Sequence, residues 1–519
     1  MFLSRLFIPL RHINAMGLLR YSRRAAFKKM QNEKRLGQFI SDPVIESTQD
    51  VASLKNTILN NVEAFSTENI DRNLLIHFIN NKQFSTALKY IQFLDEDTKN
   101  KLNLFLINQQ FLIYFYKRYN DGNLSTSEQQ LIIQLYNNLK QKSTILDCTS
   151  LENSILALSV TANWKHCITL LDDLKKIESP SGTVYSAVIA GAFLNDEEET
   201  AFTLLRDMFA EQKQPHANMF KAYFEKLKKL SGGKEILLHL DKLLKMCSDN
   251  NIILTDNISL ELCKVLDNSG LSYEHSIVNN NGFCGNCKQK LEVANISDDV
   301  FENLKKKILE NVIVGKNIFS KTTPAELSRF QKFLKTLNNV DVIIDGLNIA
   351  YVCGTNQTTK VYATLLAHVV AHFVERNKKV VVLGRKHMES WPKKEWGYVK
   401  RNADLFLTEN LSLDDPYLLY CALHCGKNST ILSRDLMRSH LFLLKDPKDK
   451  IMFSRWLEQS LLQLSFVRND GKVFFKYPRP YTRIVQHNNK HLHIPLRVVE
   501  DQTEDINKNA DKWLCIRKP

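Results

Sequence analysis

The sequence lacks any uninterrupted apolar segment that approaches the roughly 18 residues a helix needs to span a membrane. We therefore exclude an integral membrane protein, although 44% of the 519 residues are hydrophobic. Cysteine is also scarce, because ten cysteines in a chain of this length are too few for a disulfide-rich secreted protein. Charged residues make up 24% of the chain, which is typical of a folded protein, and the length indicates two to four domains.

Acidic residues are absent from the first 32 residues. The same segment has seven positive charges, on Arg5, Arg11, Arg20, Arg23, Arg24, Lys28 and Lys29. Half of the net charge of +14 therefore lies here, which leaves +7 on residues 33–519. An Arg-rich, acid-free segment interspersed with Leu, Phe and Ile is typical of a mitochondrial transit peptide. We predict that residues 1–45 are a transit peptide and linker and that the protein lies in the mitochondrial matrix; a disordered basic arm that contacts nucleic acid is the alternative.

The chain from residue 61 to residue 266 has a helical pattern throughout, and this pattern repeats. Tyr185 and Phe220 begin successive units 35 residues apart, and Leu151 lies 34 residues before Tyr185. The period and the order of the helices resemble the pentatricopeptide repeat family, most closely in the unit that has Tyr185, Ala190–Gly191, Ala201, Met208 and Pro215. The resemblance implies an α-solenoid over residues 61–266 that binds single-stranded RNA on its concave surface. A generic α-solenoid that serves as a protein scaffold is the alternative.

From Val340 onward, short β-branched segments alternate with helices. The segments DVIIDG, KKVVVLG, DLFLTE and TILSRD predict strands near residues 341, 379, 404 and 430. This alternation indicates a parallel sheet with helices on its faces. The active sites of open α/β sheets lie beyond the carboxyl ends of the strands, so the polar residues at these ends are candidate catalytic residues.

Four aspartates stand where such a site would form. Asp345 and Asp435 each follow an apolar strand, and Asp414 and Asp415 begin the helix DDPYLLYCALHC. We expect the four carboxylates to converge on one crevice, where Mg²⁺ or Mn²⁺ would relieve their mutual repulsion. Such ions promote the attack of water on a phosphodiester, which predicts metal-dependent hydrolysis. The alternatives are that the Asp pair is a simple helix cap and that each strand-end aspartate holds a loop.

Two groups of cysteines have spacings that suit metal binding. Cys284 and Cys287 form a CxxC motif, which supplies half of a tetrahedral zinc site. A redox pair is the alternative, but no thioredoxin-like βαβ pattern surrounds the motif. Cys421, His424 and Cys425 share one helix, and we interpret them as core residues because that helix is apolar.

The motifs DVIIDGLNIA, DDPYLLYCALHCG and SRDLMRSH, in this order and at these separations, resemble the metallonuclease domain of proteinaceous RNase P. The match is closest to the animal mitochondrial members of this family and covers about residues 60–519. It implies three folded parts: the pentatricopeptide α-solenoid, a central zinc-binding region formed by residues 270–338 and 478–519, and a PIN-like (NYN) metallonuclease domain over residues 339–477. It also implies Mg²⁺-dependent endonucleolytic removal of the 5′ leader of precursor tRNA, which leaves a 5′-phosphate on the mature end.

The same resemblance implies roles for individual residues. Asp345, Asp414, Asp415 and Asp435 would bind Mg²⁺ and be the catalytic residues, with support from Asn348, Arg438 and His440. Ser439 departs from the family pattern, because members usually have an aspartate before this histidine. The zinc ligands would be Cys284, Cys287, His493 and Cys515, and His491 is a rival for His493.

Partners and competing functions are also implied. Animal mitochondrial members of the family act with a tRNA methyltransferase and a short-chain dehydrogenase, so the resemblance implies these partners here, whereas plant-type members act alone. Two other functions stay open: an endonuclease that acts on other mitochondrial RNA, and a non-catalytic RNA-binding scaffold. The presence of four mutually repelling carboxylates favours a catalytic function over a scaffold.

Overall fold

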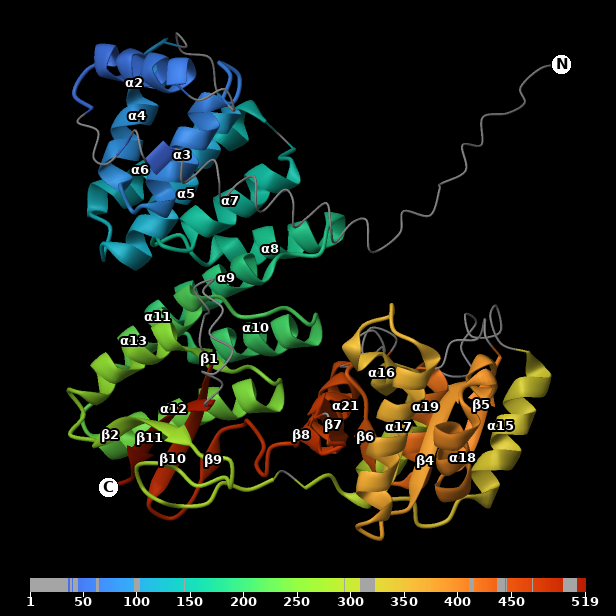
Figure 1. Cartoon of the computed structure of the whole chain (residues 1–519). Helices are drawn as coiled ribbons and strands as arrows, with labels where there is room; N and C mark the ends of the chain where they lie inside the picture. The colour runs from blue at the N-terminus through green and yellow to red at the C-terminus, as the bar shows by residue number, and fades with distance from the viewer. Residues whose placement is uncertain are drawn as a thin grey trace, which may run out of the picture. The chain divides into compact units, whose positions relative to one another are not determined.

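The computed structural model describes residues 36–37, 40, 45–61, 65–97, 103–143, 145–293, 295–308, 323–409, 415–435, 444, 446–468, 470–497 and 511–519. The basic segment predicted to be a transit peptide lies outside the described residues, as do Asp414, Arg438, Ser439 and His440. The chain divides into two compact units, residues 1–226 and residues 227–519 (Figure 1). In the described part of the chain, no helix is both long and apolar enough to cross a membrane.

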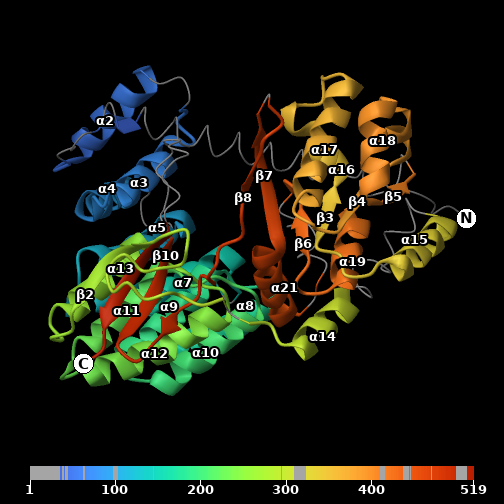
Figure 2. The same ribbon diagram turned by 60° about the horizontal axis from the view of Figure 1, so that its bottom comes forward.

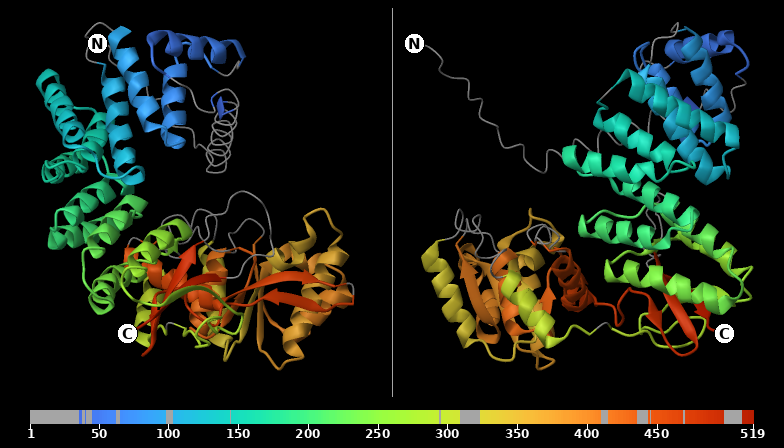
Figure 3. Two further views of the ribbon diagram at one scale, coloured as in Figure 1. Left: turned by 90° about the vertical axis from the view of Figure 1, so that its left-hand side faces the viewer. Right: turned by 180° about the vertical axis from the view of Figure 1, so that it is seen from behind.

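The first unit is helical throughout its described residues, which confirms the predicted pattern there. Figure 3 shows its helices from two further sides. They are α2 (Thr48–Asn61), α3 (Ile70–Asn80), α4 (Phe84–Asp97), α5 (Leu104–Asn120), α6 (Thr126–Lys142), α7 (Cys148–Leu158), α8 (His166–Ile177), α9 (Gly182–Leu194), α10 (Glu198–Ala210) and α11 (Ala217–Leu227).

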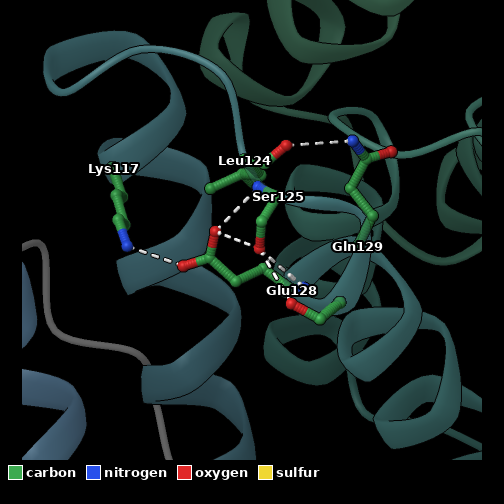
Figure 4. Close-up of polar contacts among 6 residues, drawn as sticks. Lys117, Leu124, Ser125, Glu128 and Gln129 are labelled. Carbon is green, nitrogen blue, oxygen red and sulfur yellow. Dashed lines mark hydrogen bonds and ion pairs between the residues drawn. The ribbon is translucent and has the colours of Figure 1, made fainter.

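Local hydrogen bonds explain where these helices begin. At α6, the hydroxyl of Ser125 accepts a hydrogen bond from the backbone N–H of Glu128 at 3.2 Å, and the Glu128 carboxylate accepts one from the N–H of Ser125 at 2.8 Å (Figure 4). This capping box satisfies two backbone donors at the helix start. The side chain of Lys117 on α5 also donates to the Glu128 carboxylate, at 2.6 Å, so the same residue holds α6 against α5.

The pair α9–α10 is the unit most similar to the pentatricopeptide consensus. Tyr185 and Gly191 are buried in α9, and Met208 is buried in α10. A Cβ atom at Gly191 would lie 2.9 Å from the carbonyl oxygen of Ser159 and 3.2 Å from the Cβ of Trp164. Glycine therefore permits a close approach between α9 and the turn that joins α7 to α8.

The larger sheet of the second unit has the strand order β5-β4-β3-β6-β7-β8. Neighbouring strands are parallel except for β7 and β8, which are antiparallel. The strands are β3 (Val342–Asp345), β4 (Val380–Arg385), β5 (Asp404–Thr408), β6 (Thr430–Leu432), β7 (Leu461–Val467) and β8 (Val473–Lys476). The four strands that the sequence predicts are confirmed as β3 to β6, whereas β7 and β8 are not predicted.

Helices cover both faces of this sheet (Figure 2). On β3, the side chain of Ile343 packs into one hydrophobic core, and those of Val342 and Ile344 pack into the other. The first core includes residues of α14 (Asp298–Ile308), α15 (Pro324–Thr336), α19 (Asp415–Cys425) and α21 (Pro447–Ser460), and the second includes residues of α16 (Gly346–Ala350), α17 (Thr359–Val374) and α18 (Lys393–Asn402). Burial on both faces explains why the strands are continuous apolar runs, and the predicted parallel sheet is confirmed.

A smaller sheet has the order β1-β10-β11-β2, and β9 pairs with β10. Its C-terminal strand β11 lies between β10 and β2 and is antiparallel to both, so distant parts of the chain meet here. The strands are β1 (Leu254–Thr255), β2 (Tyr273–Val278), β9 (Gln486–His487), β10 (His491–Arg497) and β11 (Asp511–Arg517), and two helices, α12 (Gly233–Asp249) and α13 (Asp256–Leu266), belong to the same unit. The predicted division into four parts is finer than these two units, and its boundaries stay a prediction.

Candidate active site and metal centre

Asp345 is the last residue of β3, and it is only 8% exposed. Its carboxylate caps the short helix α16 by accepting a hydrogen bond from the backbone N–H of Asn348 at 3.1 Å. The following residue is Gly346, where a Cβ atom would lie 2.8 Å from the carbonyl oxygen of Leu383 on β4. This tight turn places the carboxylate at the carboxyl end of the parallel strands, where open α/β sheets form their active sites.

Ser433 connects Asp345 to Asp435. It follows β6, which is a direct neighbour of β3, and it is fully buried. Its hydroxyl donates a hydrogen bond to Oδ2 of Asp345 at 3.0 Å and accepts one from the backbone N–H of Asp435 at 3.1 Å. The structure therefore brings the buried Asp345 and the exposed Asp435 together at the carboxyl ends of the parallel strands. Ser433 is not predicted from the sequence, because its only signal is its place at a strand end two residues before Asp435.

Asn348 holds the segment before Asp435 from the α16 side. Its side-chain oxygen accepts a hydrogen bond from the backbone N–H of Arg434 at 2.7 Å. The guanidinium group of Arg434 in turn donates to the carbonyl oxygen of Val352, at 3.4 Å. In this structure Asn348 thus positions the backbone that carries Asp435.

The start of α19 lies at the same edge of the sheet. The strand β5 ends at Thr408, and Asp415 is the first residue of α19, so a short connection from the carboxyl end of a parallel strand leads directly to this helix. Asp414 and the side chain of Asp415 lie outside the described residues. Convergence of all four carboxylates therefore stays a prediction, whereas the pairing of Asp345 with the Asp435 segment is observed.

Two arginines bracket Asp345 along this edge. The strand β4 ends at Arg385, and Arg434 lies two residues after the end of β6, with β3 between the two strands. Burial raises the pKa of Tyr351, and the nearby guanidinium group of Arg385 opposes part of that increase. Arginine on either side of a carboxylate cluster is suited to contacts with the phosphates of a polyanionic chain.

A second cluster lies in the smaller sheet and comprises Cys284, Cys287, His493 and Cys515. One potential ligand atom from each residue lies within 4.8 Å of all the others. Nε2 of His493 is 3.2 Å from Sγ of Cys287 and 3.6 Å from Sγ of Cys515. His493 and Cys515 face each other in the β10–β11 register, so the strand pairing itself brings these two residues together.

The backbone around the CxxC motif supports the first two ligands. The N–H of Lys288 donates to the carbonyl oxygen of Cys284 at 3.0 Å, and the N–H of Gly285 donates to that of Ile277 at 2.9 Å. Burial alone would raise the pKa of the Cys284 thiol, but hydrogen bonds from the Ser276 hydroxyl and from nearby backbone N–H groups lower it overall. These contacts favour the thiolate form, which is the form that binds a metal.

The two rival histidines lie in different surroundings. Burial, together with the charges of His491 and His487, lowers the pKa of His493 to about 4, so its imidazole is neutral near pH 7. His491 is not part of the cluster, and its ring centre lies 6.1 Å from that of His493. Three thiols and one neutral imidazole are a donor set that fits a closed, tetrahedral structural zinc site.

The other group of cysteines, Cys421 and Cys425 with His424, does not form such a cluster among the described residues. Cys421, on α19, is fully buried in the first core of the larger sheet, and Cys425 at the end of the same helix packs against this core, as predicted. His424 is exposed, and its Nε2 lies 3.1 Å from the carbonyl oxygen of Leu334, so the prediction that it is a core residue is wrong. The helical period explains this result, because the histidine lies on the edge of the apolar face.

The chain is similar to several known proteins. Residues 278–515 match the family model of protein-only RNase P. The mitochondrial ribonuclease P catalytic subunit of Mus musculus is 29% identical over 440 residues, which cover 80% of this chain and 69% of that protein. Proteinaceous RNase P 1, chloroplastic/mitochondrial, of Arabidopsis thaliana is 27% identical over 251 residues, 46% of this chain and 40% of that protein. The fold is similar to the crystal structure of nuclear proteinaceous RNase P 2 from A. thaliana, with a TM-score of 0.57 and 15% identity over 87% of this chain and 100% of that chain.

Proposed function

We propose that the chain is a protein-only RNase P and the catalytic subunit of a ribonuclease P in the mitochondrial matrix, because residues 278–515 match that family model and the chain is similar to mitochondrial catalytic subunits. As such it is an endoribonuclease that removes the 5′ leader of precursor tRNA and leaves a 5′-phosphate on the mature end. The observation that carries the proposal is the connection from Asp345 through Ser433 to Asp435. It lies at the edge of the sheet where such sites form and within the residues that match the family model.

Four aspartates would hold the catalytic cations. Asp345, Asp414, Asp415 and Asp435 form an all-oxygen donor set, which fits Mg²⁺ or Mn²⁺. When bound, these ions supply an activated water for attack on the phosphodiester and neutralise the charge that develops there.

The remaining residues of the site position the reacting groups. Ser433 and the turn into α16 fix the carboxylate of Asp345, and Asn348 fixes the backbone that leads to Asp435. The side chains of Arg385 and Arg434 would contact phosphates on the two sides of the scissile bond. Because these groups are already oriented, little reorganisation is needed when the substrate binds. We also propose a supporting role for Arg438 and His440, which lie outside the described residues.

The Cys/His cluster would hold a structural Zn²⁺ through Cys284, Cys287, His493 and Cys515. Four protein ligands leave no open position, so this ion would take no part in the reaction. It would instead tie the C-terminal strand β11 to the segment that follows β2.

The helical repeats of residues 61–266 would bind the precursor tRNA. Basic side chains supply affinity for the phosphate backbone that does not depend on sequence. We further propose that a mitochondrial tRNA methyltransferase and a short-chain dehydrogenase present the substrate, and that residues 1–45 direct the chain into the mitochondrion. The modest charge of +7 on residues 33–519 is compatible with a subunit that gains affinity from partners.

Cleavage of a 5′-labelled mitochondrial precursor tRNA tests the proposal. The chain is assayed with Mg²⁺, alone and together with the two partners, and the Asp345→Asn variant is compared with Asp341→Asn. Asp341 lies just before β3 at the opposite end of the sheet, where its carboxylate pairs with Lys378 at 2.8 Å. We expect Asp345→Asn to lower the cleavage rate at least about 100-fold, because it removes a preorganised charge from the site. Asp341→Asn should keep full activity.

Two outcomes would contradict the proposal in different ways. RNA binding without cleavage in either preparation would favour a non-catalytic scaffold. Cleavage of other mitochondrial RNA, with precursor tRNA left intact, would keep the nuclease chemistry but change the substrate.

A further inference from the structure

The β7–β8 hairpin carries an exposed aromatic and basic surface. It is formed by Phe466, Lys472, Phe474 and Lys476, and we call it the hairpin platform. Phe466 is 52% exposed, and its ring centre lies 4.6 Å from that of Phe474 with an angle of 17° between the planes. The ammonium group of Lys472 lies 5.8 Å from the centre of the Phe474 ring. Lys476 is exposed at the end of β8.

Strand alternation separates the platform from the core. On β8, Val473 is buried in the core that includes α17, and the ring of Phe475 lies 5.3 Å from that of Phe373 on this helix. The platform residues of β8 alternate with these two and therefore face the other side. On β7, an irregularity between Leu464 and Phe466 sets Phe466 opposite Phe474 in the register. Such a bulge re-aims a side chain, and here it produces a stacked pair.

The hairpin also extends past the carboxyl ends of the parallel strands, where the candidate active site lies. Leu462 on β7 is level with Leu432 on β6, which is level with Ile344, the residue before Asp345. Phe466 lies four residues further along β7, which is up to about 13 Å beyond this level at a strand rise of about 3.3 Å per residue. Figure 2 shows β7 next to β6, with β8 beyond it. Because Asp435 follows β6, the platform on β7 and β8 therefore stands beside the site on the Asp435 side.

Protection of a sheet edge does not explain this surface. In the described part of the sheet β8 is the outermost strand, and lysines on such a strand discourage pairing with another chain. The two stacked phenylalanine rings beside them would instead promote contact with another molecule, because large aromatic side chains are normally buried. Aromatic rings alternating with lysines are instead the combination that binds single-stranded nucleic acid, where bases stack on rings and ammonium groups contact phosphates.

We propose that the hairpin platform binds unpaired nucleotides of the 5′ leader, on the side of the scissile bond away from the mature tRNA. This inference rests on the proposed function, because it names the part of the substrate that lies there. Bases stack on Phe466 and Phe474, and Lys472 and Lys476 contact the intervening phosphates. Stacking is tolerant of base identity, so the platform accepts leaders of different sequence.

A binding experiment without a cleavage step tests the platform. The full chain with Asp345→Asn is titrated with two fluorescent precursor tRNAs, one with a leader of about ten nucleotides and one with a single leader nucleotide. Adding Phe466→Ala and Phe474→Ala is expected to weaken binding of the long-leader RNA about tenfold and to leave binding of the short-leader RNA unchanged. Replacing both residues by Tyr keeps the rings and should keep the preference for the long leader.

Tyr477→Ala is the matched control. Tyr477 is 65% exposed directly after β8, but its ring lies against Phe475, 6.1 Å between centres, and so belongs to the other face. The Tyr477→Ala variant should therefore bind both RNAs with unchanged affinity. The proposal is overturned if the parent chain shows no preference for the long leader, or if the double Ala variant keeps it or loses affinity for both RNAs equally. Failure of the proposed function is scored separately, as absence of cleavage by the unsubstituted chain both alone and with its two proposed partners.

Discussion

The hydroxyl of Ser433 is the hydrogen-bonding group that the two described candidate aspartates share. A carboxylate that is as buried as that of Asp345 needs compensating hydrogen bonds, because its charge is otherwise poorly solvated. The hydroxyl supplies one such bond and also fixes the backbone N–H of Asp435. A single side chain thus sets both the charge environment and the spacing of the candidate metal ligands.

Replacing Ser433 by Ala should therefore lower the rate of precursor cleavage about tenfold or more, because loss of a group that orients metal ligands typically has an effect of this size. The measurement is the cleavage rate across a range of Mg²⁺ concentrations, and the concentration needed for half-maximal rate should rise. Ser429→Ala is a matched control. Ser429 is buried just before β6, where its hydroxyl donates to the carbonyl oxygens of Ala422 and Gly426, far along the strand from the site. Equal activity of the two variants would contradict the role of Ser433.

At this scale the sequence predicts the candidate aspartates but not what holds them. Asp345 and Asp435 are recognisable because each follows an apolar strand, which is where open α/β sheets form their active sites. Ser433 is invisible by the same reasoning, because serine is common at strand ends and carries no charge. Its importance comes from a contact between β3 and β6, which are far apart in the sequence.

At the scale of secondary structure elements, burial decides which strands can be predicted. The strands β3 to β6 are apolar on both faces because helices cover both sides, so their sequences stand out. The apolar run of β8 is only Val473 to Phe475, between Lys472 and Lys476, so it is too short to stand out from the surrounding sequence. The pairing of β11 with β2 joins segments more than 200 residues apart, which no local pattern specifies.

The cluster of three cysteines and one histidine is the element-scale feature with the clearest test. His493→Ala removes a ligand that lies 3.2 Å from Cys287, whereas His491→Ala changes a neighbouring histidine of the same strand that lies outside the cluster. We expect the purified chain to hold one zinc, His491→Ala to keep it, and His493→Ala to lose most of it, because zinc affinity depends on all four ligands. Metal analysis measures the content, and proteolysis should cut the C-terminal strand β11 sooner in His493→Ala. Zinc loss in both variants, or in neither, would contradict the assignment.

At the scale of the whole molecule, the charge distribution separates two functions of the basic residues. The first 32 residues carry seven positive charges and no negative ones, and the remaining chain keeps +7. If the basic segment contacts RNA, each phosphate it neutralises steepens the slope of log affinity against log salt concentration by about 0.7 to 0.9. If it is a transit peptide, its charges act only during import and add nothing to that slope.

Deleting residues 1–32 distinguishes these possibilities. We expect the shortened chain to cleave precursor tRNA at the same rate and to show the same salt dependence of RNA binding, because the proposed site and repeats are intact. In cells it should no longer reach the mitochondrion, and a reporter protein fused to residues 1–45 should reach it. The measurements are the affinity for precursor tRNA over a series of salt concentrations and the location of both fusions by microscopy. A clearly shallower salt slope after the deletion, with delivery to the mitochondrion unaffected, would instead identify the segment as an RNA-binding arm.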